Sequence, residues 1–489
     1  MRFRSFSMLF VASNLLFSTE TLSPRPQPWV SQQHGPSTDD DSGVAECLTV
    51  KSEFSMPVGV GQPLIRSDYS TEQEYESAIY DRAIYPILRQ HAWMEYMMYW
   101  KHIYGFIYYG DIPPKTNPLE ATSNDLDAYL RSVALSEQPA GILVYWRSQH
   151  KDLCTGLILS GKRMLVQASP LISSTESGSP LKPSEYEDPR VARPRAALAG
   201  AGLSGGIALD AAKLLSLSAV LVPSRISEAL AKGVVRSLLI VPIENLGVVP
   251  FAALTVPPAN DPLIKFTTIT VAPGFDVVHK HASQSHRRTW KQALIVGDPK
   301  LTNAPNWIFP DLPGARREAI DVATLLGNSP LLGLSATHDA VVAALAKPAT
   351  LDLVYFATHG ISDPDNPQDH SFIALRGGSL YTRQVEKLKL KGRPLVVLSA
   401  CQTGLGKEFA GGMFGMALNW YYAGADAVVT SLWNVDDSET HDLMLSFMRR
   451  VKQEVPPSRA LAQAMVEQRA IRPDSLDWAS FTIYGGLPH

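Results

Sequence analysis

Short apolar runs alternate with longer segments of helical periodicity from about residue 138 to the end of the chain. The runs are rich in Val, Ile and Leu and are bounded by Gly, Pro or polar clusters, which is typical of buried strands. The runs that predict strands are 140–146, 154–159, 237–241, 268–271, 292–296, 351–356, 372–375, 394–400, 427–432 and 481–484.

Helical periodicity fills the stretches between these runs. Strands that alternate with helices of this kind predict an α/β fold, in which a mostly parallel sheet carries helices on both faces. The predicted helices are 207–217, 318–326, 338–346, 409–423, 439–452 and 458–471.

Residues 1–65 do not follow this pattern. Arg2 and Arg4 precede an apolar stretch at 6–17, and a linker rich in Ser, Pro, Gln, Asp and Gly follows. The start resembles a signal peptide but lacks a small-x-small cleavage site, so a disordered N-terminus in a cytoplasmic protein is favoured. Secretion or export to a periplasm is the alternative if residues 1–20 act as a signal. The stretch is too short to span a membrane, and no other segment qualifies.

Residues 66–135 predict a small helical module that is unusually aromatic. Its first helix has two candidate capping boxes, Ser70 with Gln73 or Thr71 with Glu74. Pro86 lies inside this helix, and we expect it to kink or split the helix. An aromatic stripe at such spacing indicates a core or a domain interface, and no repeat of fixed period is visible.

Composition narrows the function classes. The chain has 489 residues, 45% of them hydrophobic and 19% charged, with a formal net charge of −3. These values are ordinary for a globular protein and give no sign of an electrostatic nucleic-acid surface. Cys47, Cys154 and Cys401 show no C-x-x-C spacing, so we predict neither structural zinc nor a disulfide framework. We expect no metal and no cofactor.

A glycine-rich segment at 200–206 matches two motifs by letter. Residues 200–205 fit the dinucleotide pattern G-x-G-x-x-G, and residues 202–206 fit the G-x-S-x-G pattern of a serine nucleophile. Both motifs require a strand immediately upstream. Residues 191–199 show no strand pattern, so a flexible loop before a helix is the favoured interpretation.

A histidine and a cysteine follow two of the predicted strands. His359 ends the run at 351–356, and Cys401 ends the run at 394–400. The carboxyl ends of parallel strands form the ligand-binding face of an open α/β sheet, so a thiol and an imidazole meet there as the parts of a cysteine nucleophile. The main-chain N–H groups of Gly360 and Cys401 are candidates for the oxyanion hole. His370 precedes the run at 372–375, which places it at the opposite end of a strand.

These strings resemble a known family. Ala357-Thr358-His359-Gly360 and Ser399-Ala400-Cys401-Gln402-Thr403-Gly404 are similar to the His and Cys motifs of the CHAT domain family, caspase-like peptidases often fused to tetratricopeptide repeats. The resemblance covers roughly residues 138–487. Further landmarks occur in the family's order at 249–254, 296–299, 312–315 with Glu318, 423–425, 431–437 and 478–481.

The resemblance implies a caspase–hemoglobinase fold in two halves. A degenerate pseudo-caspase half would span 138–340, and the active caspase-like half would span 341–489. His359 would be the general base and acid, and Cys401 the nucleophile that forms a thioester acyl-enzyme during peptide hydrolysis. Gly360 would contribute to the oxyanion hole.

Substrate preference is implied by a second likeness. Residues 432–437 are similar to a loop of separases, in which an acidic residue pairs with a basic P1 side chain. Asp437, or else Asp436, would then line the S1 pocket. The alternative is that one of these residues caps the helix that follows, because Asp is a good N-cap residue.

The function is open between two classes. The chain is either an active cysteine endopeptidase or a catalytically silent caspase-like scaffold that recruits partners. Redox sensing at Cys401 is a weaker alternative, because no resolving cysteine lies nearby in the sequence. The expected partners are a protein or peptide substrate and, through residues 66–135 as a shortened sensor, a regulatory protein.

Overall fold

The computed structural model describes most of the chain beyond residue 63. The described residues are 44–45, 47–48, 64–106, 122–134, 139–148, 153–168, 211–242, 246, 249–272, 274–275, 288–301, 309–347, 350–363, 367–400, 406–409, 412–433 and 437–485. The glycine-rich segment 200–206 therefore lies outside the described residues, and so does the linker before residue 44.

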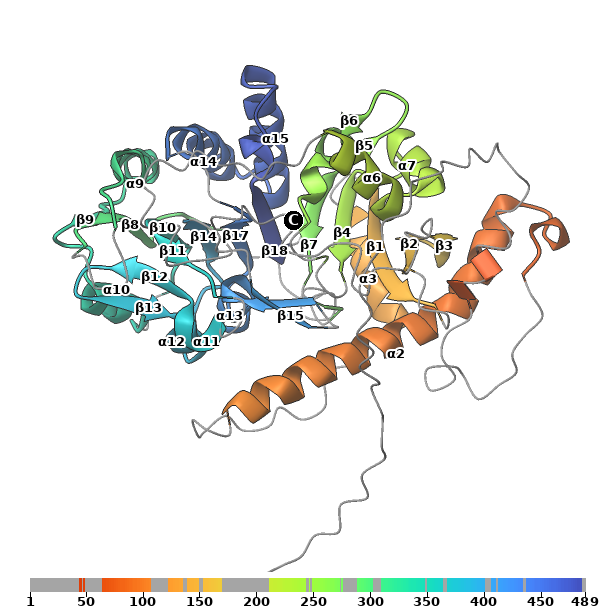
Figure 1. Ribbon diagram of the computed structural model, residues 1–489, viewed down its shortest axis with the longest axis horizontal. Helices are drawn as coiled ribbons and strands as arrows, with labels where there is room; N and C mark the ends of the chain where they lie inside the picture. The colour runs from red at the N-terminus through yellow and green to blue at the C-terminus, as the bar shows by residue number, and fades with distance from the viewer. Residues whose placement is uncertain are drawn as a thin grey trace, which may run out of the picture. The chain divides into compact units, whose positions relative to one another are not determined.

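One large sheet runs through the described residues (Figure 1). Its eleven strands lie in the order β3-β2-β1-β4-β7-β18-β17-β14-β10-β8-β9. The first five are β1 (Ala140–Arg147), β2 (Leu153–Leu159), β3 (Arg163–Ala168), β4 (Ser237–Val241) and β7 (Thr268–Val271). The other six are β8 (Ala293–Pro299), β9 (Leu331–Gly333), β10 (Leu353–Ala357), β14 (Leu395–Ser399), β17 (Ala427–Ser431) and β18 (Phe481–Gly485).

Most neighbouring strands of this sheet are parallel, as predicted. The antiparallel pairs are β1 with β2, β2 with β3, and β17 with β18. Strand β18 lies between β7 and β17 and pairs with β7 through Tyr484 opposite Val271. The sheet is therefore continuous across the chain. The predicted domain boundary at residue 340 stays a prediction. Strands β8 and β9 precede that residue, yet β8 pairs with β10, which follows it, and also with β9.

Helices lie on both sides of the sheet, which confirms the α/β class (Figure 1). Helices α9 (Pro313–Leu326), α14 (Asp437–Lys452) and α15 (Pro457–Ile471) lie on one side. Helices α12 (Thr382–Glu386) and α13 (Met416–Tyr422) lie on the other. Strands β10, β14 and β17 are buried along their whole length, because both faces of the sheet are covered there. In the described part of the chain after β1, the remaining helices of two turns or more are α6 (Ala211–Leu221), α7 (Ser224–Ala231) and α10 (His338–Leu345).

Smaller elements surround the large sheet. A three-stranded sheet contains β11 (Gly360–Ile361), β12 (Phe372–Leu375) and β13 (Gly378–Tyr381), with α11 (Pro367–His370) before β12. Short pairs are formed by β5 (Thr255–Val256) with β6 (Asp261–Pro262) and by β15 (Gly406–Phe409) with β16 (Gly412–Gly415). The 3-10 turns are η1 (Arg66–Asp68), η3 (Phe251–Ala253), η4 (Leu263–Lys265) and η5 (Asp477–Ala479).

The helix predicted over 409–423 is wrong in its first half. Residues up to Gly415 form the β15–β16 hairpin, and α13 begins only at Met416. The apolar residues of this stretch suggested one helix, but Gly412 and Gly415 weaken helical structure by their conformational freedom. The helix therefore begins after the last of these glycines.

Before the large sheet the chain forms α2 (Glu72–Phe106) and α3 (Ser123–Ala134). The capping box of Thr71 and Glu74 is confirmed, because each residue's main-chain N–H donates to the other's side chain, at 3.0 and 3.1 Å. Of the two predicted effects of Pro86, a split is wrong, since α2 continues through this residue, and a kink stays a prediction. Burial of a face that includes Tyr75, Ile79 and Ile87 offsets the hydrogen bond that proline removes.

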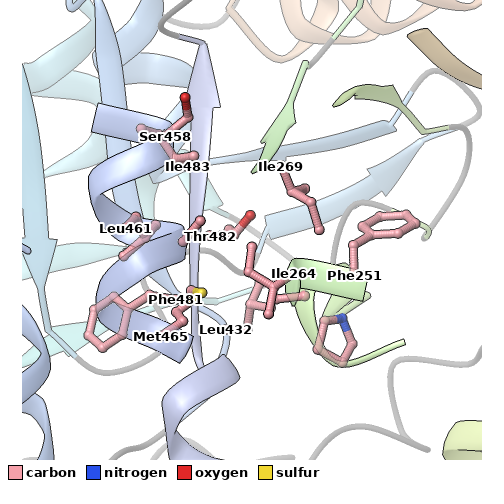
Figure 2. Close-up of a pocket in the computed structure, with 13 residues that line it drawn as sticks. Phe251, Ile264, Ile269, Leu432, Ser458, Leu461, Met465, Phe481, Thr482 and Ile483 are labelled. Atoms are coloured by element: carbon pink, nitrogen blue, oxygen red, sulfur yellow. The ribbon is translucent and has the colours of Figure 1, made fainter. Parts of the chain in front are cut away.

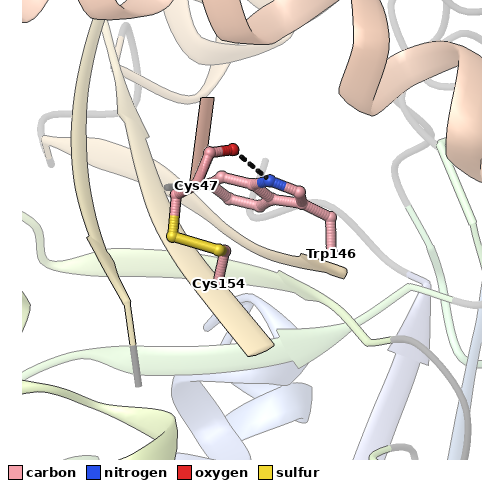
Figure 3. The surroundings of a disulfide bond; sticks show 3 residues. All are labelled: Cys47, Trp146 and Cys154. Carbon is pink, nitrogen blue, oxygen red and sulfur yellow. Dashed lines mark hydrogen bonds between the residues drawn. A yellow bond between two sulfur atoms is a disulfide. The ribbon is translucent and has the colours of Figure 1, made fainter. Parts of the chain in front are cut away.

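The predicted absence of a disulfide is also wrong. Cys47 and Cys154 are bonded, with their Cα atoms 5.6 Å apart and a separation of 107 positions in sequence (Figure 3). The indole N–H of Trp146 donates to the carbonyl oxygen of Cys47 at 2.9 Å, so the same short segment is held twice against β1 and β2. Cysteine spacing cannot reveal a pairing that depends on which distant segments meet.

None of the helices in the described part of the chain has both the length and the apolar character needed to cross a bilayer.

Candidate active site

Parallel pairing brings the ends of β10 and β14 together. Ala357 lies opposite Ser399 in the register, and positions 359 and 401 both come two residues later along their chains. The structure describes this edge as far as Ala400, whose carbonyl oxygen accepts a 2.6 Å hydrogen bond from the Ser431 hydroxyl. Cys401 is the next residue in sequence and lies outside the described residues.

His359 is buried at the carboxyl end of β10, with 7% of its surface exposed. Its Nε2 atom lies 2.8 Å from the carbonyl oxygen of Pro310, and its ring lies 5.3 Å from the ring of Phe309. A carbonyl oxygen can only accept a hydrogen bond, so Nε2 carries the proton. In a neutral imidazole this bond selects the Nε2–H tautomer, so Nδ1 is the acceptor nitrogen that a general base requires.

The backbone around His359 is fixed by the three-stranded sheet. The carbonyl oxygen of His359 accepts from the main-chain N–H of Ala374 at 2.9 Å, and the Thr358 hydroxyl donates to the carbonyl oxygen of Ala374 at 3.0 Å. Gly360 opens β11 directly after the histidine, opposite Ile373. These contacts hold the backbone of His359 and of its two neighbours in sequence against β12. The part of Gly360 in an oxyanion hole stays a prediction.

Phe309 and Pro310 were not among the predicted site residues. Pro310 acts through its main-chain carbonyl, and a main-chain group carries no residue-type signal in a sequence. The nearby string Leu312-Pro313-Gly314-Ala315 is one of the family landmarks in the sequence, and it forms the start of α9. That landmark was the one hint that this segment approaches the site.

The two predicted S1 residues lie at the start of α14. Asp437 is the first residue of this helix, whereas the sequence had suggested a start near Glu439. Asp436 lies outside the described residues, and so does the side chain of Asp437. The choice between lining S1 and capping the helix therefore stays a prediction for both residues.

His370 ends α11 and precedes β12, as the sequence predicted. Strand β12 belongs to the small sheet rather than to the large one, so the argument from opposite ends of one sheet does not apply. The Nδ1 atom of His370 lies 3.0 Å from a carboxylate oxygen of Asp363, and the side chain is 62% exposed. His370 is therefore exposed to solvent, whereas His359 is buried.

Beneath the site, a buried polar contact joins β10 to α9. The hydroxyl of Tyr355 donates to a carboxylate oxygen of Glu318 at 2.7 Å, and both residues are almost fully buried. Burial is the main cause that raises the pKa of Tyr355 well above its usual value, and the neighbouring Glu318 adds to it. The phenol therefore stays protonated and fixes α9 against the strand that carries His359.

A small cavity lies where β7 meets β18, beneath α15 (Figure 2). It holds about 20 Å³, which is room for roughly one water molecule. Apolar side chains form most of its wall, including those of Phe251, Ile264, Met465 and Phe481. No titratable side chain lines it, so the cavity has no means of acid–base chemistry. Among the described residues, no cluster of His, Cys, Asp and Glu is arranged to hold a metal ion.

The sequence itself shows the family. Residues 212–486, more than half of the chain, match the CHAT domain. The chain belongs to the CHAT domain family. Tetratricopeptide repeat protein 28 of Mus musculus and of Homo sapiens are both 27% identical over 234 residues. These matches cover 40% of this chain but 9% of each relative, so the chain spans less than a tenth of the curated relatives' length.

Solved structures give more distant likenesses. The Arg-specific cysteine proteinase gingipain R is 13% identical, with a TM-score of 0.39, over 57% of this chain and 68% of that one. The Saccharomyces cerevisiae separase–securin complex is 9% identical, with a TM-score of 0.44, over 85% of this chain and 34% of that one.

Proposed function

We propose that this CHAT domain is a cysteine endopeptidase in which Cys401 is the nucleophile and His359 the general base and acid. The observation that carries the proposal is the hydrogen bond from His359 Nε2–H to the Pro310 carbonyl at 2.8 Å. In a neutral imidazole that bond selects the Nε2–H tautomer and makes Nδ1 the acceptor nitrogen. His359 follows β10, and the neighbouring strand β14 leads to Cys401. An acceptor nitrogen beside a thiol is the arrangement that a thiolate nucleophile needs.

The chemistry follows from these two side chains. Nδ1 of His359 takes the proton from Sγ of Cys401, and the thiolate attacks the carbonyl carbon of the scissile peptide. The tetrahedral oxyanion is stabilised by main-chain N–H groups, for which Gly360 and Cys401 are our candidates. The C–N bond then breaks, and the imidazolium gives its proton to the leaving amine. Water, deprotonated by His359, hydrolyses the thioester and regenerates the thiol.

Reactivity of the thiol tests this proposal. Cys401 is the one cysteine outside the Cys47–Cys154 bond, so iodoacetamide labelling of the unreduced protein reports on this residue. We expect labelling at pH 7 to be abolished by Cys401→Ala and slowed about tenfold or more by His359→Ala, because a free thiol has a pKa of about 8.5. His370→Ala is the matched control, since it removes an exposed histidine. Equal labelling of wild type and His359→Ala would leave a silent scaffold as the function.

We further propose that an acidic residue at the start of α14 selects a basic P1 side chain. Asp437 is the first residue of that helix, and Asp436 directly precedes it. Fluorogenic peptides that differ only at P1 test the idea, with Asp436→Asn and Asp437→Asn compared separately. We expect Arg or Lys at P1 to be preferred, and one of the two variants to lose that preference. A preference for uncharged P1 residues in the wild type would exclude an acidic S1 pocket.

We also propose that a regulatory protein binds the aromatic-rich module at residues 66–135, which includes α2. Glu76 of α2 pairs with Arg163 of β3 at 3.3 Å, and Glu72 pairs with Arg225 of α7. A partner that binds the module would therefore act on the edge strand β3 of the first five strands. Crosslinking of the full chain with and without residues 66–106 would show whether a bound protein depends on this helix.

A further inference from the structure

The carbonyl group that orients His359 lies in a segment without regular structure. Residues 309–312 connect to the start of α9 and belong to no helix or strand. Pro310 is exposed, yet its carbonyl oxygen sits 2.8 Å from the buried imidazole. The direction of that carbonyl must therefore be set by contacts elsewhere in the segment.

Asp298 supplies such a contact. Its Oδ1 atom accepts the main-chain N–H of Leu312 at 3.0 Å, two residues after Pro310. Asp298 lies at the carboxyl end of β8, beside β10, where the pairing with β9 shifts register between Gly297 and Pro299. Its φ angle is +41°, in the left-handed region that few residues other than Gly, Asn and Asp adopt. An irregularity of this kind turns a side chain away from its ordinary direction.

The neighbouring glycine allows α9 to come close enough for this contact. A Cβ atom at Gly297 would lie 2.3 Å from Cβ of Ala319, which is on the face of α9 against β8. The helix start is therefore held near the end of β8 by packing, and Asp298 binds the residue just before the helix. Leu312 occupies the N-cap position of α9, and its own side chain makes no capping hydrogen bond.

We propose that Asp298 is a positioning residue for the reaction: through the Leu312 amide it fixes the Pro310 carbonyl, and through that carbonyl it orients His359. This inference rests on the proposed function, because it assigns a purpose to the orientation of a general base. The hydrogen bond carries the effect. The carboxylate charge has a smaller part, since its partner Arg316 is 3.7 Å away and 48% exposed.

Another contact in the same segment provides a control. Lys300 Nζ lies 3.0 Å from a carboxylate oxygen of Asp311, between Pro310 and Leu312 in sequence. Both side chains of this pair are more than half exposed, and their contact does not involve the main chain. Removing this pair changes the charge of the segment without touching the Asp298–Leu312 hydrogen bond.

Four substitutions separate the hydrogen bond from charge. Asp298→Gly removes the acceptor and suits the left-handed backbone, and Asp298→Glu moves the acceptor by one methylene as an independent disruption. Asp298→Asn keeps an acceptor oxygen and tolerates the same backbone. Asp311→Asn is the matched charge control. Circular dichroism and thermal unfolding establish that each variant is folded.

Two readouts are needed, one of them independent of Cys401. The first is the pH profile of iodoacetamide labelling at Cys401. We expect Asp298→Gly and Asp298→Glu to slow labelling at pH 7 by about tenfold or more and to move the midpoint toward that of His359→Ala. Asp298→Asn and Asp311→Asn should stay within about threefold of wild type. The second is ¹⁵N NMR of histidine in the Cys401→Ala background, where Asp298→Gly should lose the Nε2–H tautomer at His359 and Asp298→Asn should keep it.

The outcomes distinguish the two proposals. If the wild type and His359→Ala are labelled at the same rate, the peptidase proposal fails. The tautomer of His359 measured by NMR then decides whether Asp298 is a positioning residue. If labelling depends on His359 but the folded Asp298→Gly and Asp298→Glu proteins keep the wild-type profile and tautomer, the positioning proposal is overturned. Equal loss in Asp298→Asn and Asp298→Gly overturns the hydrogen-bond assignment.

Discussion

The imidazole of His91 donates through Nε2 to the main-chain carbonyl of Tyr145 at 2.9 Å, which joins α2 to β1 inside the core. The histidine is 2% exposed, and burial lowers its pKa to about 4, although the hydrogen bond to the Tyr145 carbonyl acts in the opposite direction. The residue is therefore neutral in the folded protein at physiological pH. Protonation would place a charge in the core, so it opposes the burial of His91 between the helical module and the sheet.

This contact predicts acid sensitivity. The unfolded chain takes up a proton at His91 near pH 6.5, whereas the folded protein resists until about pH 4. The stabilisation is thus present above pH 6.5 and is lost as the pH falls, by roughly 3 kcal/mol over the whole interval. Urea unfolding at pH 7 and pH 4.5 should show a smaller pH effect in His91→Gln, which can still donate to the carbonyl. If the unfolding free energy of His91→Gln changes between pH 7 and pH 4.5 as much as that of the wild type, His91 is not the source of the acid sensitivity.

The pairing of His441 with Asp321 predicts the opposite dependence on pH. His441 of α14 contacts Asp321 of α9 at 2.9 Å and Asp442 at 3.1 Å. Burial alone would lower the pKa of His441, but the hydrogen bonds to these carboxylates and the nearby Glu318 outweigh it, so the pKa is raised. The stabilisation is complete below the unfolded pKa of about 6.5 and disappears as the pH rises through the folded value.

Asp321→Asn tests this pair. We expect the variant to be less stable than wild type at pH 6 by about 0.5–1 kcal/mol, with a difference that shrinks by pH 8.5. Glu228→Gln is a control for the loss of one surface carboxylate, because Glu228 faces Lys232 rather than a histidine. A destabilisation that is the same at both pH values would mean that the His441 charge does not contribute.

Asp426 should be one of the most costly positions to change. Its carboxylate is 5% exposed and is held by both Arg288 and Arg393, just before β17 begins. Asp426→Asn leaves two guanidinium groups without their counter-charge, so we expect a loss of about 3–5 kcal/mol in unfolding free energy. Asp261→Asn, which removes a more exposed partner of Lys265, should cost less than about 1 kcal/mol. Similar costs for the two variants would contradict the importance of burial.

The Cys47–Cys154 bond predicts sensitivity to reduction. It closes a long loop, so its loss should lower the free energy of unfolding by about 2–5 kcal/mol. Guanidinium unfolding with and without dithiothreitol measures this effect in wild type, and the Cys47→Ser, Cys154→Ser double variant should not respond to the reductant. Cytosolic reductants keep most thiols reduced, so we expect the bond in protein recovered from an oxidising compartment. Three alkylatable thiols in that protein would refute the pairing.

Sequence alone predicted several buried strands with their bounds. Strands β4 and β7 have the predicted bounds, because each is a short run rich in β-branched residues or Leu, and a proline follows within two residues of its end. The edge strand β3 was not predicted, since Arg163 and Gln167 interrupt its apolar pattern. Before Met416 the pattern of apolar residues predicted a helix, but the glycines there favour the hairpin that the structure shows.

Of the predicted site side chains the structure describes that of His359, whereas Cys401 and Asp436 lie outside the described residues. His359 stands where the strand pattern and the CHAT resemblance placed it, at the carboxyl end of β10. The Pro310 carbonyl could not be inferred, because no residue type marks a carbonyl that points at a histidine. Asp298 belonged to a quoted landmark, but its contact with Leu312 depends on how α9 meets β8 in space.

The position of β18 has a consequence for the order of assembly during synthesis. Residues 481–485 form the strand between β7 and β17, so the strands made early and the strands made late share no sheet until these residues have left the ribosome. Domains fold broadly in the order in which they are synthesised, and here the joining strand is translated after both of the parts that it joins. A nascent chain that stops before Phe481 would expose the facing edges of β7 and β17, which are open to pairing with other chains.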